Sequence, residues 1–155
     1  MDLFDELKLL LDALRRERVP HALWGGLALA VHGFIRATED IDLLVEPSAL
    51  AGLRAAVEPL GFRFDPVPMT FRGGGVTIYQ LMKTVGSDFV LLDALMVTPA
   101  TQAAWDSRDS VPSEFGWVDV VSPAGLIALK KLRASGQDQD DIRQLQKLIH
   151  ESESS

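Results

Sequence analysis

The sequence contains no cysteine. This absence excludes a disulfide framework and any chemistry that depends on a thiolate. No stretch approaches the roughly 18 consecutive apolar residues of a membrane-spanning helix, and the acidic N-terminus lacks the basic start and long apolar core of a signal peptide. We therefore expect a soluble, cytoplasmic protein that has no membrane partner.

Basic residues are also in the minority. The chain has 15 Lys and Arg against 22 Asp and Glu, which gives a formal net charge of -7. This excess of negative charge disfavours broad, sequence-independent contact with nucleic-acid phosphates. Local basic clusters at 15–18 and 130–133 leave a confined contact with nucleic acid open. Bound magnesium would also cancel part of the negative charge of a site.

The 155 residues, 47% of them hydrophobic, suffice for one domain with a proper core. No repeat or low-complexity block divides the chain, so we expect a single domain over 1–150 and a disordered tail over 151–155. Apolar periodicity and stop signals predict helices at 2–18, 27–33, 47–60, 123–134 and 138–150, and strands at 21–24, 40–45, 62–64, 76–82, 89–97 and 117–121.

The order of these elements is mixed. We expect a loop over 66–75, a short helix after Pro99 and a closing pair of C-terminal helices. The chain lacks the repeated strand-helix units of a doubly wound fold. The prediction is an α+β fold in which helices flank a central mixed sheet.

Two adjacent glycines, Gly25 and Gly26, follow a short apolar strand that ends at Trp24, and a segment rich in helix formers comes next. They therefore fall at a strand-to-helix turn. The free amides and the positive dipole end of a helix start attract an anion such as a triphosphate, and glycine leaves the backbone accessible to it. Paired glycines by themselves are often only turn residues.

Two aspartates, Asp40 and Asp42, lie in a strand that otherwise carries apolar residues. Strand alternation places both carboxylates on one face. Carboxylates that close repel each other unless a cation lies between them, and oxygen ligands suit magnesium. Taken alone, such a pair is more commonly the exposed end of a surface strand.

A third aspartate, Asp93, stands in the middle of the apolar stretch 89–97, which has the composition of an interior strand. An ionised carboxylate in such surroundings is costly unless it is paired or binds a metal. We therefore expect Asp93 to lie beside Asp40 and Asp42, on an adjacent strand.

Together these residues resemble the signature of the nucleotidyltransferase superfamily, which has a polymerase-beta-like fold. That signature is a hydrophobic residue before Gly-Gly, an Asp-x-Asp strand and a later lone Asp. The segments 25–33, 36–42, 126–130 and 138–142 are similar to AbiEii/AbiGii-type toxins and related small nucleotidyltransferases. The usual Lys-Asp before the last helix is Gln137-Asp138 here. The resemblance covers most of residues 21–148.

The resemblance implies an enzyme that transfers a nucleoside monophosphate from a nucleoside triphosphate to a hydroxyl, with pyrophosphate leaving. It further implies that Asp40 and Asp42 bind two Mg²⁺ ions, for which Mn²⁺ can substitute, and that Asp93 completes the site of the ion that activates the acceptor. Gly25-Gly26 and Lys130 would hold the triphosphate.

Four residues have two interpretations each. Lys130 lies on the apolar side of its predicted helix, where it either snorkels outward or meets an anion, and we favour the anion. Arg36 and Thr38 precede the metal strand, where they either contact phosphate or satisfy the hydrogen bonds of a turn. Asp119 is either a further site carboxylate or, more commonly for such a position, an outward-facing strand residue. The histidines lack metal-ligand spacing and are interpreted as structural or surface residues.

The acceptor is not specified by these residues: RNA, protein and a small molecule all stay open. The resemblance raises the toxin of a toxin-antitoxin system, with an antitoxin or a second copy of the chain as partner and the leucine-rich first helix as a candidate contact. One alternative is a catalytically weak nucleotide-binding or protein-interaction module. Another is a nucleotide-sugar glycosyltransferase, whose metal motif needs neither the glycine turn nor Asp93.

Overall fold

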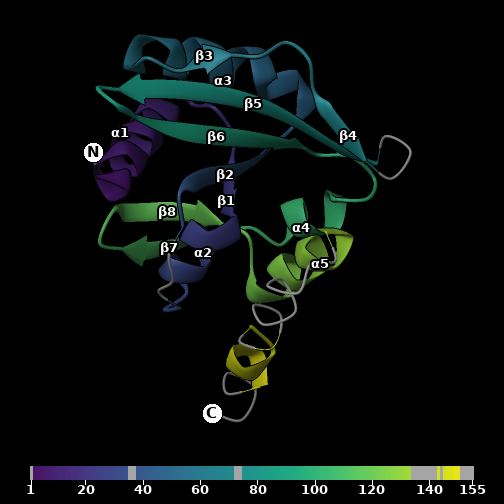
Figure 1. Cartoon of the computed structure of the whole chain (residues 1–155). Coiled ribbons are helices and arrows are strands. Elements are labelled where there is room, and N and C mark those ends of the chain that lie inside the picture. Colours follow the sequence, from purple (N-terminus) through teal and green to yellow (C-terminus); the bar gives the residue numbers. More distant parts are fainter. Residues whose placement is uncertain (1, 35–37, 72–74, 134–142, 144, 151–155) are drawn as a thin grey trace.

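A computed structural model describes residues 2–34, 38–71, 75–133, 143 and 145–150 (Figure 1). Its strands are β1 (Ala22–Trp24), β2 (Asp40–Val45), β3 (Arg63–Phe64), β4 (Met69–Phe71), β5 (Val76–Val85), β6 (Asp88–Met96), β7 (Asp109–Ser113) and β8 (Gly116–Val120). Its helices are α1 (Leu3–Arg16), α2 (Gly25–Val31), α3 (Leu50–Val57), α4 (Gln102–Asp106) and α5 (Pro123–Arg133), with 3-10 turns η1 (Pro47–Ala49) and η2 (Glu58–Leu60).

In the described part of the chain, eight strands form one sheet in the order β3-β5-β6-β2-β1-β8-β7, and β4 pairs with the start of β5. The pairs β2–β6 and β1–β8 are parallel and the others are antiparallel. Helices flank this sheet (Figure 1). The fold is α+β with a central mixed sheet, as the order of elements predicted.

The first helix closes one face of the sheet. Asp2 caps α1, because its side chain accepts a 2.8 Å hydrogen bond from the backbone N–H of Phe4. Four leucines at helical spacing are at most 1% exposed: Leu7, Leu10, Leu11 and Leu14. They belong to the same core as Ile41 and Leu43 of β2. These four leucines are therefore buried in the core of this chain. The expectation that they form a contact surface for a partner is wrong.

Two strands were not predicted. β4 lies inside the segment 66–75 that was expected to be a loop, and β7 precedes the predicted strand at 117–121. β4 is only three residues long and exposed throughout, and β7 contains Pro112. Both lack the apolar run that identifies a strand from sequence, and proline is tolerated in β7 because this strand lies at the edge of the sheet.

Other boundaries agree closely with the expectations. β2 covers the predicted residues, while the predicted helix 47–60 is divided into η1, α3 and η2 and ends at Gly61, whose φ is +104°. Residues 145–150 are helical and Leu145 is fully buried, in agreement with part of the last predicted helix. Residues 134–142 and the tail 151–155 lie outside the described residues. None of the described helices is long and apolar enough to cross a membrane.

Candidate active site

One face of the sheet carries the three predicted aspartates. β2 and β6 pair in parallel, with Asp42 and Asp93 as register partners, and Asp40 lies two residues before Asp42. Register partners and residues two apart share a face of a sheet, so all three side chains belong to one face, called the site face below. All three line a cavity of about 620 Å³. The predicted placement of Asp93 beside the other two aspartates is confirmed.

The glycine turn lies against this cluster. Gly25 begins α2 with φ +74°, and Trp24 before it is the register partner of Asp42. A Cβ atom added to Gly25 would lie 2.1 Å from Oδ2 of Asp42, and one added to Gly26 would lie 2.8 Å from Oγ1 of Thr38. Glycine at both positions therefore leaves room for the side chains of Asp42 and Thr38. The sequence alone did not reveal this reason for the two glycines.

A residue that sequence reasoning missed holds Asp93. Gln80 of β5 is its register partner across the antiparallel β5–β6 pair, and Nε2 of Gln80 donates a 3.0 Å hydrogen bond to Oδ1 of Asp93. This bond leaves Oδ2 of Asp93 for other interactions. The only signal in the sequence is that Gln80 interrupts an otherwise apolar strand, and the pairing with Asp93 depends on the register of the hairpin.

The three aspartates match magnesium in residue type and backbone position. Adjacent strands are about 4.8 Å apart, and a magnesium ion lies about 2.1 Å from each oxygen ligand, so carboxylates on neighbouring strands can share one ion. Among the described residues, no group of three or more His, Cys, Asp or Glu side chains is drawn together closely enough to hold a metal. The backbone therefore provides the positions, and binding would require the carboxylates to turn toward a common ion.

The rest of the cavity is apolar. Besides the three aspartates, the described residues that line it are Trp24 of β1, Met69 and Phe71 of β4, Val76 and Ile78 of β5, Leu95 of β6, and Leu129 and Leu132 of α5. The strand residues all lie on the site face, because Ile78 pairs with both Met69 and Leu95, and Val76 pairs with Phe71. α5 contributes the side opposite the sheet.

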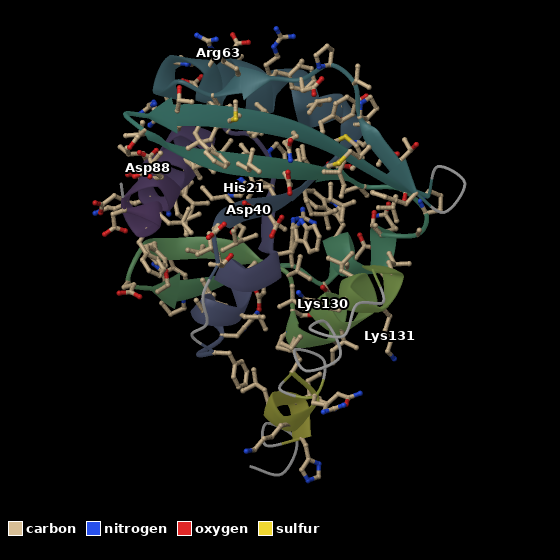
Figure 2. The ribbon with its side chains drawn as sticks, viewed as in Figure 1. His21, Asp40, Arg63, Asp88, Lys130 and Lys131 are labelled. Carbon is tan, nitrogen blue, oxygen red and sulfur yellow. The ribbon has the colours of Figure 1, made fainter. Side chains whose placement is uncertain are left out.

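Lys130 is 3% exposed, whereas the neighbouring Lys131 is exposed. Figure 2 shows Lys130 on the inner side of α5 and Lys131 at the periphery. This burial excludes the interpretation in which the ammonium group of Lys130 snorkels to solvent. Lys130 is not among the described residues that line the cavity, although Leu129 next to it is.

The two residues predicted before the metal strand have different outcomes. Arg36 lies outside the described residues. Thr38 is half-buried against Gly26, and its hydroxyl donates a long hydrogen bond of 3.5 Å to the backbone carbonyl of Asp40. In this structure Thr38 therefore stabilises the turn that leads into β2.

Two histidines have structural contacts. Nδ1 of His21 donates to the carbonyl of Val19 over 2.8 Å, and Nε2 of His32 donates to the carbonyl of Val121 over 2.9 Å. Burial lowers the pKa of His21 below its usual 6.5, against the opposing effects of the Val19 hydrogen bond and the charge of Asp119. Asp119 itself is half-buried in β8 and does not line the cavity.

No protein-family model matches this sequence, and no curated protein matches it significantly. Solved structures are similar in fold. The crystal structure of ANT(2")-Ia in complex with adenylyl-2"-tobramycin has a TM-score of 0.62 and 17% sequence identity, over 97% of this chain and 96% of that one.

The lincosamide antibiotic adenylyltransferase LnuA, bound to lincomycin, has a TM-score of 0.61 and 16% identity over 93% of this chain and 96% of that one. A candidate nucleotidyltransferase from Thermotoga maritima has a TM-score of 0.62 and 14% identity over 96% and 93%. At these identities the similarity establishes the fold, which is that of nucleotidyltransferases.

Proposed function

We propose that this protein is a nucleotidyltransferase that transfers a nucleoside monophosphate from a nucleoside triphosphate to the hydroxyl of an acceptor. One observation carries the proposal: Asp42 contacts the glycine turn on one side and is the register partner of Asp93 on the other. Carboxylates that line the cavity are thereby brought against a strand-to-helix glycine turn. The shared fold with antibiotic adenylyltransferases supports the same reaction class.

In the proposed reaction the acceptor oxygen forms a bond to the α-phosphorus, and the bond from that phosphorus to the bridging oxygen breaks, so that pyrophosphate leaves. Two Mg²⁺ ions, replaceable by Mn²⁺, would lower the pKa of the acceptor hydroxyl and neutralise the leaving phosphates. Asp40 and Asp42 would hold both ions. Asp93, oriented by Gln80, would hold one of them and take the hydroxyl proton.

The triphosphate would lie beside the glycine turn. Gly25 and Gly26 would offer backbone amides to its oxygens, since these donors are fixed and need no reorganisation. Lys130 would offset phosphate charge from the buried side of α5, and Arg36 and Thr38 would contact phosphate from the segment before β2. The roles of the glycine turn and Lys130 come from the resemblance to nucleotidyltransferases, and those of Arg36 and Thr38 come from their position before the metal strand.

The biological setting follows from the same resemblance. The protein would act as the toxin of a toxin-antitoxin system, with an antitoxin or a second copy as partner. A second candidate function is a catalytically weak nucleotide-binding or protein-interaction module of such a pair. The observation that favours it is that the three carboxylates, as placed, do not converge on one metal position.

The test is to incubate the protein with Mg²⁺ and each labelled triphosphate, with total RNA, with a panel of hydroxyl-bearing small molecules that includes lincomycin and tobramycin, or without an acceptor, and to follow transfer of the label. We expect transfer that disappears on chelation of the metal and falls about 10²- to 10⁴-fold in Asp93→Asn, the range for loss of a general base. The matched control is Asp119→Asn, which removes a carboxylate of the same sheet that does not line the cavity. Transfer by Asp93→Asn at the wild-type rate would refute the assigned role. Nucleotide binding by calorimetry without any transfer would identify the weak module instead.

A further inference from the structure

The cavity has two chemically different halves on one sheet. The aspartates occupy β2 and β6, while Met69, Phe71, Val76 and Ile78 occupy β4 and β5. Cross-strand pairing joins these four apolar residues into one patch, because Met69 is the partner of Ile78 and Phe71 is the partner of Val76. Such directly opposed side chains contact each other on the face of a sheet. We call these four residues the apolar patch.

The apolar patch and the carboxylates are continuous. Ile78 pairs with Leu95 of β6, and Leu95 lies two residues from Asp93 on the same face. A molecule lying across the strands would therefore touch the apolar patch at one end and reach the carboxylates at the other. The glycine turn is on the far side of the carboxylates, since β1 is beyond β2 in the sheet order.

The part of the patch that lies on β4 is accessible. Met69 is 41% exposed and Phe71 is 52% exposed, although both line the cavity. A large exposed apolar surface that adjoins a pocket marks a binding site more often than a purely structural surface. On the opposite side Leu129 and Leu132 of α5 add a second apolar wall.

The charge of the lining restricts the occupant. The described lining consists of three aspartates and eight apolar residues, without a lysine or arginine. An RNA end would bring several phosphates, which bind through basic side chains. The three aspartates would repel these phosphates, whereas a neutral or cationic molecule avoids this repulsion. The cavity volume of about 620 Å³ is in the usual range for a small-molecule site.

We infer that the apolar patch is the acceptor subsite, and that the acceptor is a small, neutral or cationic molecule with an apolar face and a hydroxyl. This inference rests on the proposed function and names its acceptor class. The apolar face of the acceptor packs on β4 and β5, which directs the hydroxyl toward Asp93. The hydroxyl oxygen then bonds to the α-phosphorus, pyrophosphate departs, and Asp93 takes the proton.

The first experiment measures binding of two fluorescent probes with the same ring system, neutral N-phenyl-1-naphthylamine and anionic 1-anilinonaphthalene-8-sulfonate. We expect the neutral probe to bind the wild-type protein at least about tenfold more tightly than the anionic one. Phe71→Ser and Met69→Ser should each weaken the neutral probe about tenfold, the scale of one lost aromatic or large apolar contact. Equal affinity of the two probes, or no effect of either substitution, would overturn the inference.

Two control variants separate this site from other apolar surfaces. Thr70→Ser changes β4 on the face opposite to the patch, and Trp117→Ser removes a side chain that is 62% exposed and does not line the cavity. Both should leave binding of the neutral probe unchanged. Melting curves verify that each variant is folded. A loss of binding in the Trp117 variant equal to that in the Phe71 variant would place the probe elsewhere and contradict the proposal.

The second experiment separates the acceptor from the nucleobase and from RNA. If the patch holds the acceptor, magnesium-ATP and the neutral probe bind together, and neither adenosine nor total RNA displaces the probe. Displacement by adenosine would assign the patch to the nucleobase, and displacement by RNA would assign it to a nucleic acid; either result overturns the inference. Probe binding needs no nucleotide, so the two proposals are tested separately. Label transfer by a protein that does not bind the probe at the patch refutes this inference alone. Probe binding without label transfer to any acceptor tested refutes the proposed function.

Discussion

At the scale of single residues, the site depends on two side chains that lie close to the backbone of the glycine turn. The carboxylate of Asp42 lies where a side chain at residue 25 would begin, and the hydroxyl of Thr38 lies where one at residue 26 would begin. Gly25 also has φ +74°, a region that costs an L-residue about 1–2 kcal/mol. The glycine turn and the aspartate pair are thus one packed unit, and a change in the first displaces the second.

Gly25→Ala tests this dependence. We expect it to destabilise the protein by more than about 1–2 kcal/mol, because the strain of a positive φ is added to a methyl group that would lie 2.1 Å from Oδ2 of Asp42. Label transfer should fall with it, since Asp42 must move. Urea unfolding and the transfer assay measure both effects.

The matched control is Gly52→Ala in α3. The nearest atom to its added Cβ is 3.7 Å away, so we expect a gain of about 0.5–1 kcal/mol, the usual advantage of alanine over glycine inside a helix. Equal stability of the two variants would show that Gly25 is not constrained by its backbone or by Asp42.

At the scale of elements, α1 is attached to the sheet by apolar packing and by one shielded ion pair. Nζ of Lys83 lies 2.7 Å from Oε2 of Glu6, and the side chains are 16% and 11% exposed. Lys83 belongs to the sheet face opposite to the apolar patch, because it is an odd number of residues from Ile78 along β5. α1 therefore packs behind the candidate active site, where it stabilises the strands that carry the aspartates.

Lys83→Met should destabilise the protein by about 3 kcal/mol, because it leaves the shielded carboxylate of Glu6 without its partner. The double variant Glu6→Leu, Lys83→Met should recover most of this loss, since two apolar side chains can replace a shielded pair. Urea unfolding at neutral pH measures these differences.

Glu58→Gln provides the comparison, because it breaks the Arg54–Glu58 pair, whose side chains are 53% and 50% exposed. The expected change is below about 1 kcal/mol. A larger loss in this variant than in Lys83→Met would contradict the argument from burial.

At the scale of the whole molecule, charge and burial act together. The chain carries a net charge of -7, and three of its carboxylates line one cavity with apolar walls. His21 is 4% exposed just before β1, and burial lowers its pKa, whereas Asp119 raises it and Arg15 and Arg108 lower it further. Folding therefore favours the neutral form of His21.

This burial predicts a stability that depends on pH. Because the folded-state pKa of His21 is lowered, the unfolded chain binds a proton first, and the free energy of unfolding falls as the pH decreases below the unfolded value of about 6.5. His21→Asn keeps an N–H donor for the carbonyl of Val19 but cannot be protonated. Urea unfolding at about pH 7.5 and pH 5 should show a smaller loss on acidification in this variant than in the wild type. Identical losses would exclude His21 as a contributor.

Much of the fold and the acidic part of the site could be predicted from local patterns. Alternation in 40–45 places Asp40 and Asp42 on one face, the apolar stretch 89–97 predicts an interior strand around Asp93, and the glycines mark the turn after β1. Each of these signals extends over a few neighbouring residues, so backbone preference and alternation decide them. The helical periodicity of α1 and its cap at Asp2 are of the same kind.

The other features of the site, which are the contact of Gln80 with Asp93 and the apolar patch, depend on the register of strands that are far apart in the sequence. The pairing of Gln80 with Asp93 and of Met69 with Ile78 depends on how β4, β5, β6 and β2 align, and a slip of one residue would turn each side chain to the other face. No short window of sequence contains that alignment, because it is set by packing between segments far apart in the chain. Composition and local spacing thus fix which residue types are available for chemistry, whereas the pairing of distant strands places an apolar patch beside them.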